Sequence, residues 1–181
     1  MSDVAVLEAR WVFGYGSLMW RPGFPHVETR PGRLIGAHRS LCVFSHVHRG
    51  TPEHPGLVMG LNNGGACRGM VFRVADGDWP EVLAYLRARE QVTNVYLESV
   101  RPVRLDDGSS VAALCYLVDR HHRQYAGELP DDVMVEIISG STGQSGPNRD
   151  YVFNTVAHLR EMGVTDRRLF ALADRLAERS G

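Results

Sequence analysis

A short glycine-containing loop near the start of the chain has residue types that could bind a small polar group. Residues 11–15 are apolar, aromatic or β-branched apart from one glycine, which predicts a buried strand. The chain continues as Gly14-Tyr15-Gly16-Ser17, and glycine lets a backbone approach a ligand closely. A strand that ends in such a loop presents backbone N–H groups and a hydroxyl at a rigid edge.

Two familiar uses of such a loop do not fit these residues. A dinucleotide-binding fingerprint would need a third glycine where the chain has Met19. A nucleophile elbow needs glycine two residues before and two residues after the serine, but Ser17 has Tyr15 and Met19 there. The loop is therefore either a binding loop of another kind or a simple tight turn.

Glu90 is a carboxylate where the sequence pattern calls for a core residue. A helix is predicted over 78–90, and its apolar stripe includes Leu83 and Leu86, seven and four residues before Glu90. Partial burial and the C-terminal end of the helix dipole both raise a carboxylate pKa toward the range of a general base. The alternative is an ion pair with an arginine, such as Arg87 or Arg89. Glu98, in the next strand, is expected to face solvent.

The histidines and cysteines do not predict a metal site or a disulfide. His46 and His48 are spaced to share one face of a strand, but no acidic or thiol ligand stands at a conventional spacing from them. The three cysteines, Cys42, Cys67 and Cys115, have no CxxC spacing and lie in strand-like segments. We expect buried, reduced thiols.

The composition is that of an ordinary globular protein. The 181 residues are 44% hydrophobic and 23% charged, with a formal net charge of −1, which does not indicate binding to nucleic acid or to a membrane surface. There is neither a signal-peptide core nor an apolar run of membrane-spanning length, so a cytoplasmic location is expected. We predict a single domain over 1–181, with 1–10 as a loose tail.

The order of the predicted elements is strands first and helices mostly last. Strands are predicted over 11–15, 34–46, 57–61, 66–74, 95–105 and 111–119, with hairpin turns at 62–65 and 106–108. Helices are predicted over 78–90, 130–139 and 148–162, with a last one that begins after Thr165 or Asp166. This order favours an α+β fold in which a mostly antiparallel sheet curls into a small barrel.

The opening WVFGYGSLMW resembles that of the ChaC family, the glutathione-specific γ-glutamylcyclotransferases, and bacterial members are the most similar. Further matches follow in order along nearly the whole chain: Gly36, His38-Arg39, Gly69-x-x-Phe72-Arg73, Arg89-Glu90, Tyr96 and Ser145-Gly146-x-Asn148-x-x-Tyr151. The ordered set is much more specific than the loop alone. It selects Glu90 independently of the helix pattern.

The resemblance implies the γ-glutamylcyclotransferase fold, a small β-barrel with flanking helices. It implies that the α-amine of a γ-glutamyl group attacks its own γ-carbonyl, with Glu90 as the catalytic acid and base and with no metal or cofactor. It also implies a small-molecule partner, glutathione or a related γ-glutamyl compound. The implied substrate-binding residues are Val12, Phe13, Gly14, Tyr15, Gly16, Ser17, Leu18, Arg39 and Tyr151.

Other functions stay open at this point. Residues 40–48 depart from eukaryotic members of the family, so another γ-glutamyl peptide or a γ-glutamylamine is an alternative substrate. A non-catalytic γ-glutamyl-binding module is a further alternative, against which the presence of Glu90 counts. A hydrolase that uses Ser17 or Cys42 is a third.

Overall fold

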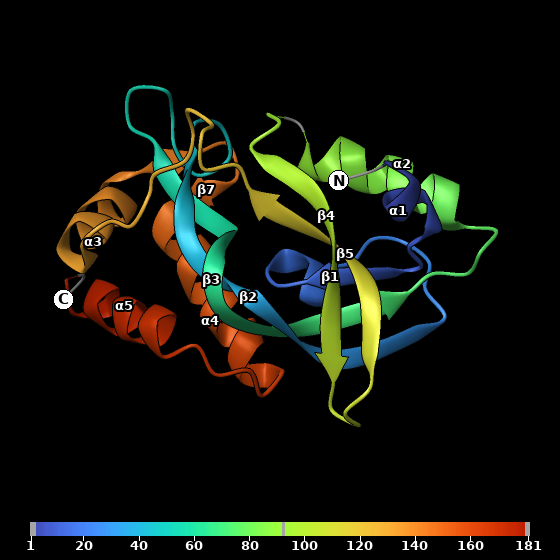
Figure 1. The fold of residues 1–181 in the computed structure, drawn as a ribbon. Helices are drawn as coiled ribbons and strands as arrows, with labels where there is room; N and C mark the ends of the chain where they lie inside the picture. The colour runs from blue at the N-terminus through green and yellow to red at the C-terminus, as the bar shows by residue number, and fades with distance from the viewer. Residues whose placement is uncertain (1–2, 92, 180–181) are drawn as a thin grey trace. The chain divides into compact units, whose positions relative to one another are not determined.

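Five β-strands of the chain form a closed barrel. The computed structural model describes residues 3–91 and 93–179. The barrel strands are β1 (Trp11–Gly14), β2 (Glu28–Ser45), β3 (Gly56–Arg73), β4 (Tyr96–Leu105) and β5 (Ser110–Val118), in the order β1-β3-β2-β4-β5 (Figure 1). The pairs β1–β3, β2–β4 and β4–β5 are antiparallel, whereas β1 pairs with β5 in parallel. The predicted α+β class with a small, mostly antiparallel barrel is confirmed.

Helices and one short hairpin complete the described chain. The helices are α1 (Asp3–Glu8), the 3₁₀ turn η1 (Ser17–Met19), α2 (Trp79–Glu90), α3 (Asp131–Gly140), α4 (Asn148–Glu161) and α5 (Arg167–Glu178). The hairpin joins β6 (Thr142–Gly143) to β7 (Gly146–Pro147). Asp166 caps α5 by accepting a hydrogen bond from the N–H of Leu169, at 3.1 Å. Within the described residues, no helix is both long enough and apolar enough to span a membrane.

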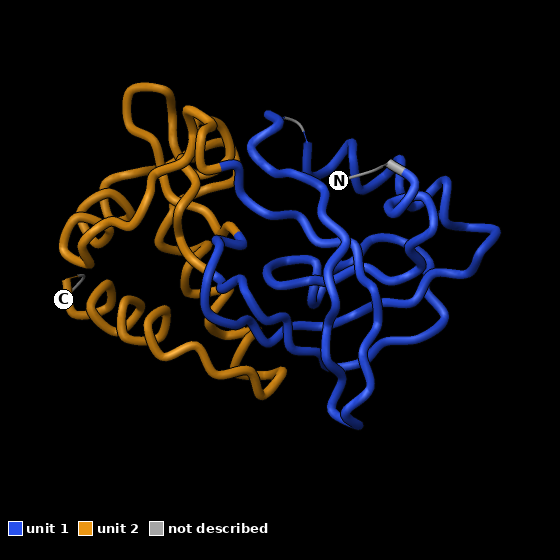
Figure 2. The backbone as a smooth tube through the Cα atoms, in the orientation of Figure 1, with its two compact units in different colours: residues 1–39, 61–119 blue, residues 40–60, 120–181 orange. Residues whose placement is uncertain are grey.

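The chain divides into two compact units, although the sequence predicts a single domain. One unit, called unit 1 here, comprises residues up to 39 together with 61–119, and unit 2 comprises 40–60 together with the residues from 120 onward (Figure 2). The two long strands β2 and β3 each pass from one unit into the other.

The glycines at 64 and 65 do not make the predicted hairpin. β3 is one continuous strand from Gly56 to Arg73, so the prediction of two strands with a turn at 62–65 is wrong. Gly64 and Gly65 both have positive φ, 95° and 70°, and the Gly64 carbonyl lies 2.9 Å from Nδ1 of His38 on β2. Glycines with positive φ inside a strand bend it locally without reversing it.

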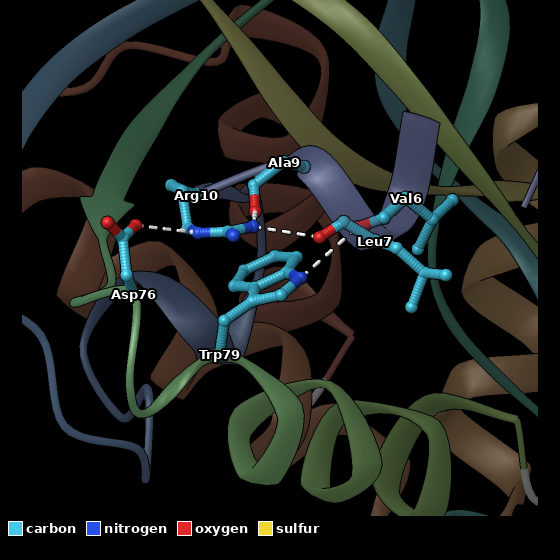
Figure 3. A network of polar contacts seen from close by, with 6 residues as sticks. All are labelled: Val6, Leu7, Ala9, Arg10, Asp76 and Trp79. Carbon is cyan, nitrogen blue, oxygen red and sulfur yellow. Dashed lines mark hydrogen bonds and ion pairs between the residues drawn. The ribbon is translucent and has the colours of Figure 1, made fainter. Parts of the chain in front are cut away.

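Residues 3–8 form helix α1 and this segment packs through two buried side chains, so the prediction of a loose tail is wrong for residues 3–10. Residues 1–2 lie outside the described part. Val6 and Ala9 are only 4% and 5% exposed, and the indole of Trp79 donates a hydrogen bond to the Val6 carbonyl, at 3.2 Å (Figure 3). Arg10 pairs with Asp76 at 2.8 Å. These contacts fix the start of α2 against the segment that enters β1.

The buried face of α2 determines where its last residue lies. Val82, Leu83 and Leu86 belong to one apolar cluster with Leu18 from η1 and Tyr116 from β5. Because side chains at positions i and i+4 share a helix face, Glu90 follows Leu86 on this side of α2. The barrel and the 3₁₀ turn therefore position the carboxylate that the sequence pattern selects.

Candidate active site

The loop after β1 contains a 3₁₀ turn and one exposed residue that bears a hydroxyl. Tyr15 and Leu18 are buried, 6% and 5% exposed, whereas Ser17 is exposed. The N–H of Met19 donates to the Gly16 carbonyl, at 2.9 Å, and this bond closes the 3₁₀ turn. The predicted residues Val12 and Phe13 are fully buried in β1, so in this structure they support the loop from below.

Gly14 allows this loop to fold back on its own strand. A Cβ atom at position 14 would lie 3.1 Å from the backbone nitrogen of Met19 and 3.2 Å from Cβ of Leu18. A Cβ atom at Gly69, on the neighbouring strand β3, would lie 2.2 Å from the Gly14 carbonyl oxygen. The absence of side chains at these two positions permits the close packing of strand and loop.

Arg39 supports the loop from the barrel. Its side chain is buried, and its Nε donates to the Tyr15 carbonyl oxygen, at 2.5 Å. Its Nη2 donates to the Arg68 carbonyl on β3, at 2.8 Å, and lies 3.5 Å from the sulfur of Met19. The guanidinium thus holds both ends of the turn. Direct contact between Arg39 and a substrate stays a prediction.

Glu90 is the last residue of α2, and its side chain is 17% exposed. Burial raises the pKa of this carboxyl above its ordinary value, and the adjacent Arg89 guanidinium opposes the rise. The ion pair considered as an alternative exists, since Nε of Arg89 lies 3.2 Å from Oε1 of Glu90. Because burial is the larger effect, the pair does not prevent Glu90 from having the raised pKa of a candidate base.

Arg89 joins Glu90 to the loop, which the sequence patterns do not predict. Its Nη2 donates to the Ser17 hydroxyl oxygen, at 3.0 Å, while its Nε faces Glu90. Its Nη1 donates to the carbonyls of Arg21 and Pro22 at 2.9 and 3.1 Å, and lies 2.9 Å from the Tyr85 hydroxyl. The sequence indicates Arg89 as a candidate ion-pair partner of Glu90 and as part of the Arg89-Glu90 match, and it does not indicate the contact with the loop.

A second carboxylate lies close by and is already paired. Glu98 accepts two hydrogen bonds from Arg87, both at 2.8 Å, and a third from the Tyr116 hydroxyl, at 3.1 Å. Its side chain is only 13% exposed, so the prediction that it faces solvent is wrong. Burial, followed by the charges of Glu98 and Glu90, raises the pKa of Tyr116. Tyr116 is therefore a neutral hydroxyl that lies within the electrostatic reach of both carboxylates.

Tyr151 belongs to unit 2, whereas the loop, Arg39 and Glu90 belong to unit 1. On α4, the Tyr151 hydroxyl accepts a hydrogen bond from the N–H of Met59, at 3.0 Å. The Arg49 guanidinium lies 5.4 Å from the centre of its ring. That Tyr151 shares a substrate site with the loop stays a prediction.

The cysteines and histidines add no further reactive group to this site. All three cysteines are free and buried, and burial raises the pKa of Cys42 to about 11 and that of Cys115 to about 12. A thiol with such a pKa is not an activated nucleophile, which disfavours a hydrolase that uses Cys42. Over residues 3–91 and 93–179, no three His, Cys, Asp or Glu side chains gather in a way that could hold a metal ion.

Comparison with known proteins gives consistent results over nearly the whole chain. The family model described as ChaC-like protein matches residues 10–179. The glutathione-specific gamma-glutamylcyclotransferase of Escherichia coli (strain K12) is 34% identical over 156 residues, which cover 86% of this chain and 68% of that protein. Gamma-glutamylcyclotransferase 2-3 of Arabidopsis thaliana is 32% identical over 176 residues, which cover 93% of this chain and 88% of that protein. A crystal structure of the yeast gamma-glutamyl cyclotransferase specific to glutathione matches the fold with a TM-score of 0.83 at 24% identity, over 93% of this chain and 95% of that chain.

Proposed function

The chain belongs to the ChaC family, and from that premise we propose that it is a γ-glutamylcyclotransferase that converts glutathione into 5-oxoproline and Cys-Gly. One observation carries the proposal for the site. A single guanidinium, that of Arg89, contacts both the Ser17 hydroxyl of the loop and the Glu90 carboxylate, at 3.0 and 3.2 Å. The predicted binding loop and the predicted base are therefore neighbours.

The reaction is an intramolecular acyl transfer that needs no nucleophile from the protein. The α-amine of the γ-glutamyl group attacks the γ-carbonyl carbon, and a new C–N bond closes a five-membered lactam. The amide bond to the cysteine nitrogen then breaks. The substrate ammonium group loses two protons on its way to the lactam N–H, and the leaving nitrogen gains two when it ends as an ammonium group, so neither water nor a net proton is consumed.

Glu90 is the group that we propose carries a proton from the attacking nitrogen to the leaving nitrogen. The amine of the substrate is protonated near neutral pH, so it must lose a proton before it can attack. A carboxylate whose pKa is raised by burial accepts a proton more readily than an ordinary glutamate, and as a carboxylic acid it can return the proton to the leaving nitrogen. The three hydrogen bonds that Glu98 accepts make it a poorer candidate for this role.

The loop is the proposed binding element. Backbone N–H groups of residues 15–18 would bind the α-carboxylate of the substrate or the developing oxyanion. Ring closure requires a folded conformation of the γ-glutamyl group, and we propose that the loop, which Arg39 holds by hydrogen bonds, favours that conformation by positioning. Tyr151 is proposed as a further substrate-binding residue on the basis of the family motif.

We propose that the two units work together as one γ-glutamylcyclotransferase domain, which the family match over residues 10–179 supports. Three free cysteines support a reducing compartment, which is consistent with the expected cytoplasmic location. The proposed partner is a small molecule.

The test is the release of 5-oxoproline from glutathione by the wild-type protein and by Glu90→Gln, with EDTA present in both. Glutamine has nearly the same shape as glutamate and cannot act as a base, so we expect Glu90→Gln to lose at least roughly 100-fold in kcat. Glu98→Gln is the matched control, because it removes a neighbouring carboxylate of similar burial. We expect it to retain most of the activity.

Other outcomes would change the proposal in defined ways. If Glu98→Gln were inactive and Glu90→Gln active, the assigned base would be wrong. If Ser17→Ala abolished turnover while Glu90 was intact, a serine hydrolase would be favoured, whereas our mechanism predicts only a weaker enzyme. If the wild type released 5-oxoproline from γ-glutamyl-lysine and not from glutathione, the substrate would be a γ-glutamylamine.

A further inference from the structure

We propose that Arg89 is a positioning residue for this reaction, whose guanidinium holds the Glu90 carboxylate and the Ser17 hydroxyl in one fixed arrangement. The inference rests on the proposed function and goes beyond it, because it assigns a catalytic effect to a residue that need not touch the substrate.

The contacts of Arg89 determine the orientation of its planar group. The guanidinium is anchored at Nη1 to the carbonyls of Arg21 and Pro22 and to the Tyr85 hydroxyl. That anchoring leaves Nη2 directed at Ser17 and Nε directed at Glu90. Because the N–H donors of arginine form a rigid fork, fixing Nη1 also fixes the other two nitrogens. A lysine ammonium could not make contacts in these separate directions.

Arg89 also determines how Ser17 can act. The Ser17 oxygen accepts the hydrogen bond from Nη2, and a hydroxyl that accepts from a cation keeps its own proton for donation. Ser17 is exposed, so this proton can be donated to a substrate oxygen. The carboxylate and the carbonyl of a γ-glutamyl group both offer such oxygens.

The effect of Arg89 on Glu90 has a definite sign. Burial raises the pKa of Glu90, and the positive charge of Arg89 lowers it. Other charged or titratable groups nearby include Tyr85 on α2, whose hydroxyl accepts from Arg89, and Tyr116 on β5, whose own pKa is raised in part by Glu90. The Arg87–Glu98 pair binds the Tyr116 hydroxyl. Loss of the Arg89 charge therefore raises the pKa of Glu90, and a larger fraction of the base is protonated at a given acidic pH.

The test measures kcat, KM and the pH dependence of kcat/KM with glutathione for three variants, Arg89→Gln, Arg89→Lys and Arg87→Gln. For Arg89→Gln we expect kcat/KM to fall roughly 10- to 100-fold, and its acidic limb to move to higher pH. Arg89→Lys keeps the positive charge, so the acidic limb of its pH profile should stay close to that of the wild type. Its kcat/KM should still fall, because lysine cannot contact both Ser17 and Glu90 as the guanidinium does. Arg87→Gln is the matched control, two residues earlier on α2, because it removes an arginine that pairs with Glu98.

A purely structural role for Arg89 would lower the amount of folded enzyme and leave the pH profile of the remaining activity unmoved. Circular dichroism and thermal unfolding establish the folded fraction of each variant. If Arg89→Gln does not fold, the kcat/KM of Arg89→Lys is the deciding measurement. A wild-type value for this variant would overturn the proposal. An equal shift of the limb in Arg87→Gln and Arg89→Gln would also overturn it, because net charge would then explain the effect.

Failure of this inference can be told apart from failure of the proposed function. If Glu90→Gln is active, the proposed base is wrong and the Arg89 argument falls with it. If Glu90→Gln is inactive and the Arg89 variants behave as the wild type, only the positioning role is wrong. A titration of ¹³C-labelled glutamate carboxyls in the substrate-free protein, with the Glu90 signal identified from Glu90→Gln, gives the direction of the Glu90 pKa shift in Arg89→Gln without any activity measurement.

Discussion

Substitution of Asn148 should destabilise unit 2 more than a substitution of similar size at an exposed position. Asn148 is the first residue of α4, and none of its surface is exposed to solvent. Its Oδ1 accepts a hydrogen bond from the N–H of Leu57, at 2.7 Å, and its Nδ2 donates to the carbonyl of the same residue, at 2.8 Å. One side chain thus satisfies both backbone polar groups of a residue in β3 that is itself fully buried.

The cost of Asn148→Ala follows from these two bonds. Alanine removes both partners and leaves a buried N–H and a buried carbonyl without them. Each unpaired buried group costs about 1–3 kcal/mol, so the free energy of unfolding should fall by about 2–6 kcal/mol. For a chain of this size, each kcal/mol lowers the melting temperature by about 2–4 °C.

The assay is thermal and urea unfolding followed by circular dichroism, with Asn154→Ala as the control. Asn154 is the same residue type in the same helix but is exposed, so its change in stability should stay within about 0.5 kcal/mol. The reasoning is refuted if the two variants unfold together. Asn148→Asp adds a second check, because the aspartate can donate to the Leu57 carbonyl only when protonated, so this variant should regain part of its relative stability at acidic pH.

Three further predictions concern Glu90, the buried thiols and the packing of Gly69 against Gly14. Glu90→Gln should melt above the wild type at neutral pH, because a carboxyl whose pKa is raised by burial stabilises the fold only when protonated; scanning fluorimetry should show the gap closing below the ordinary glutamate pKa of 4.5. A persistent gap at low pH would contradict this reasoning. Cys42 and Cys115 should not react with Ellman's reagent at pH 8 until denaturant is added, since burial raises both pKa values, to about 11 and about 12; rapid reaction of the folded protein would show an accessible thiol. Gly69→Ala should lower the free energy of unfolding, measured in urea, by about 1–3 kcal/mol, because its Cβ would lie 2.2 Å from the Gly14 carbonyl oxygen. An unchanged midpoint of urea unfolding would mean that the two strands can separate at low cost.

The features that the sequence predicts best are those that depend on neighbouring residues. The strands on either side of the 106–108 turn, and the turn itself, depend on neighbouring residues, and the β4–β5 pairing confirms them. Asn-Gly at 63–64 is equally local, yet the predicted hairpin is wrong, because these residues lie within a long strand paired with distant segments. Helix α1 is not predictable from the sequence, because six residues are too short to show a periodic pattern and a contact from the distant Trp79 stabilises it.

In the candidate site, too, local features are predictable from the sequence and contacts between distant residues are not. Glu90 is predictable because a carboxylate interrupts an apolar stripe with a fixed period. The contacts of Arg89 are not, because Ser17 lies 72 positions away and the Arg21 carbonyl 68 positions away. The environment of Glu98 is not predictable for the same reason, since a strand pattern indicates which face a residue occupies and nothing about Tyr116 and Arg87 on other elements.

The interleaving of the two units has a consequence for how the protein is made. Residues 40–60 belong to unit 2 but lie between the two segments of unit 1, so neither unit is one continuous stretch of chain. During synthesis, 40–60 leave the ribosome long before the helices from 131 onward with which they form unit 2, while unit 1 can be completed once residue 119 has emerged. No simple truncation at either end yields an isolated unit. Exchange of one unit between relatives would require an insertion into the middle of the other, which favours joint inheritance of both.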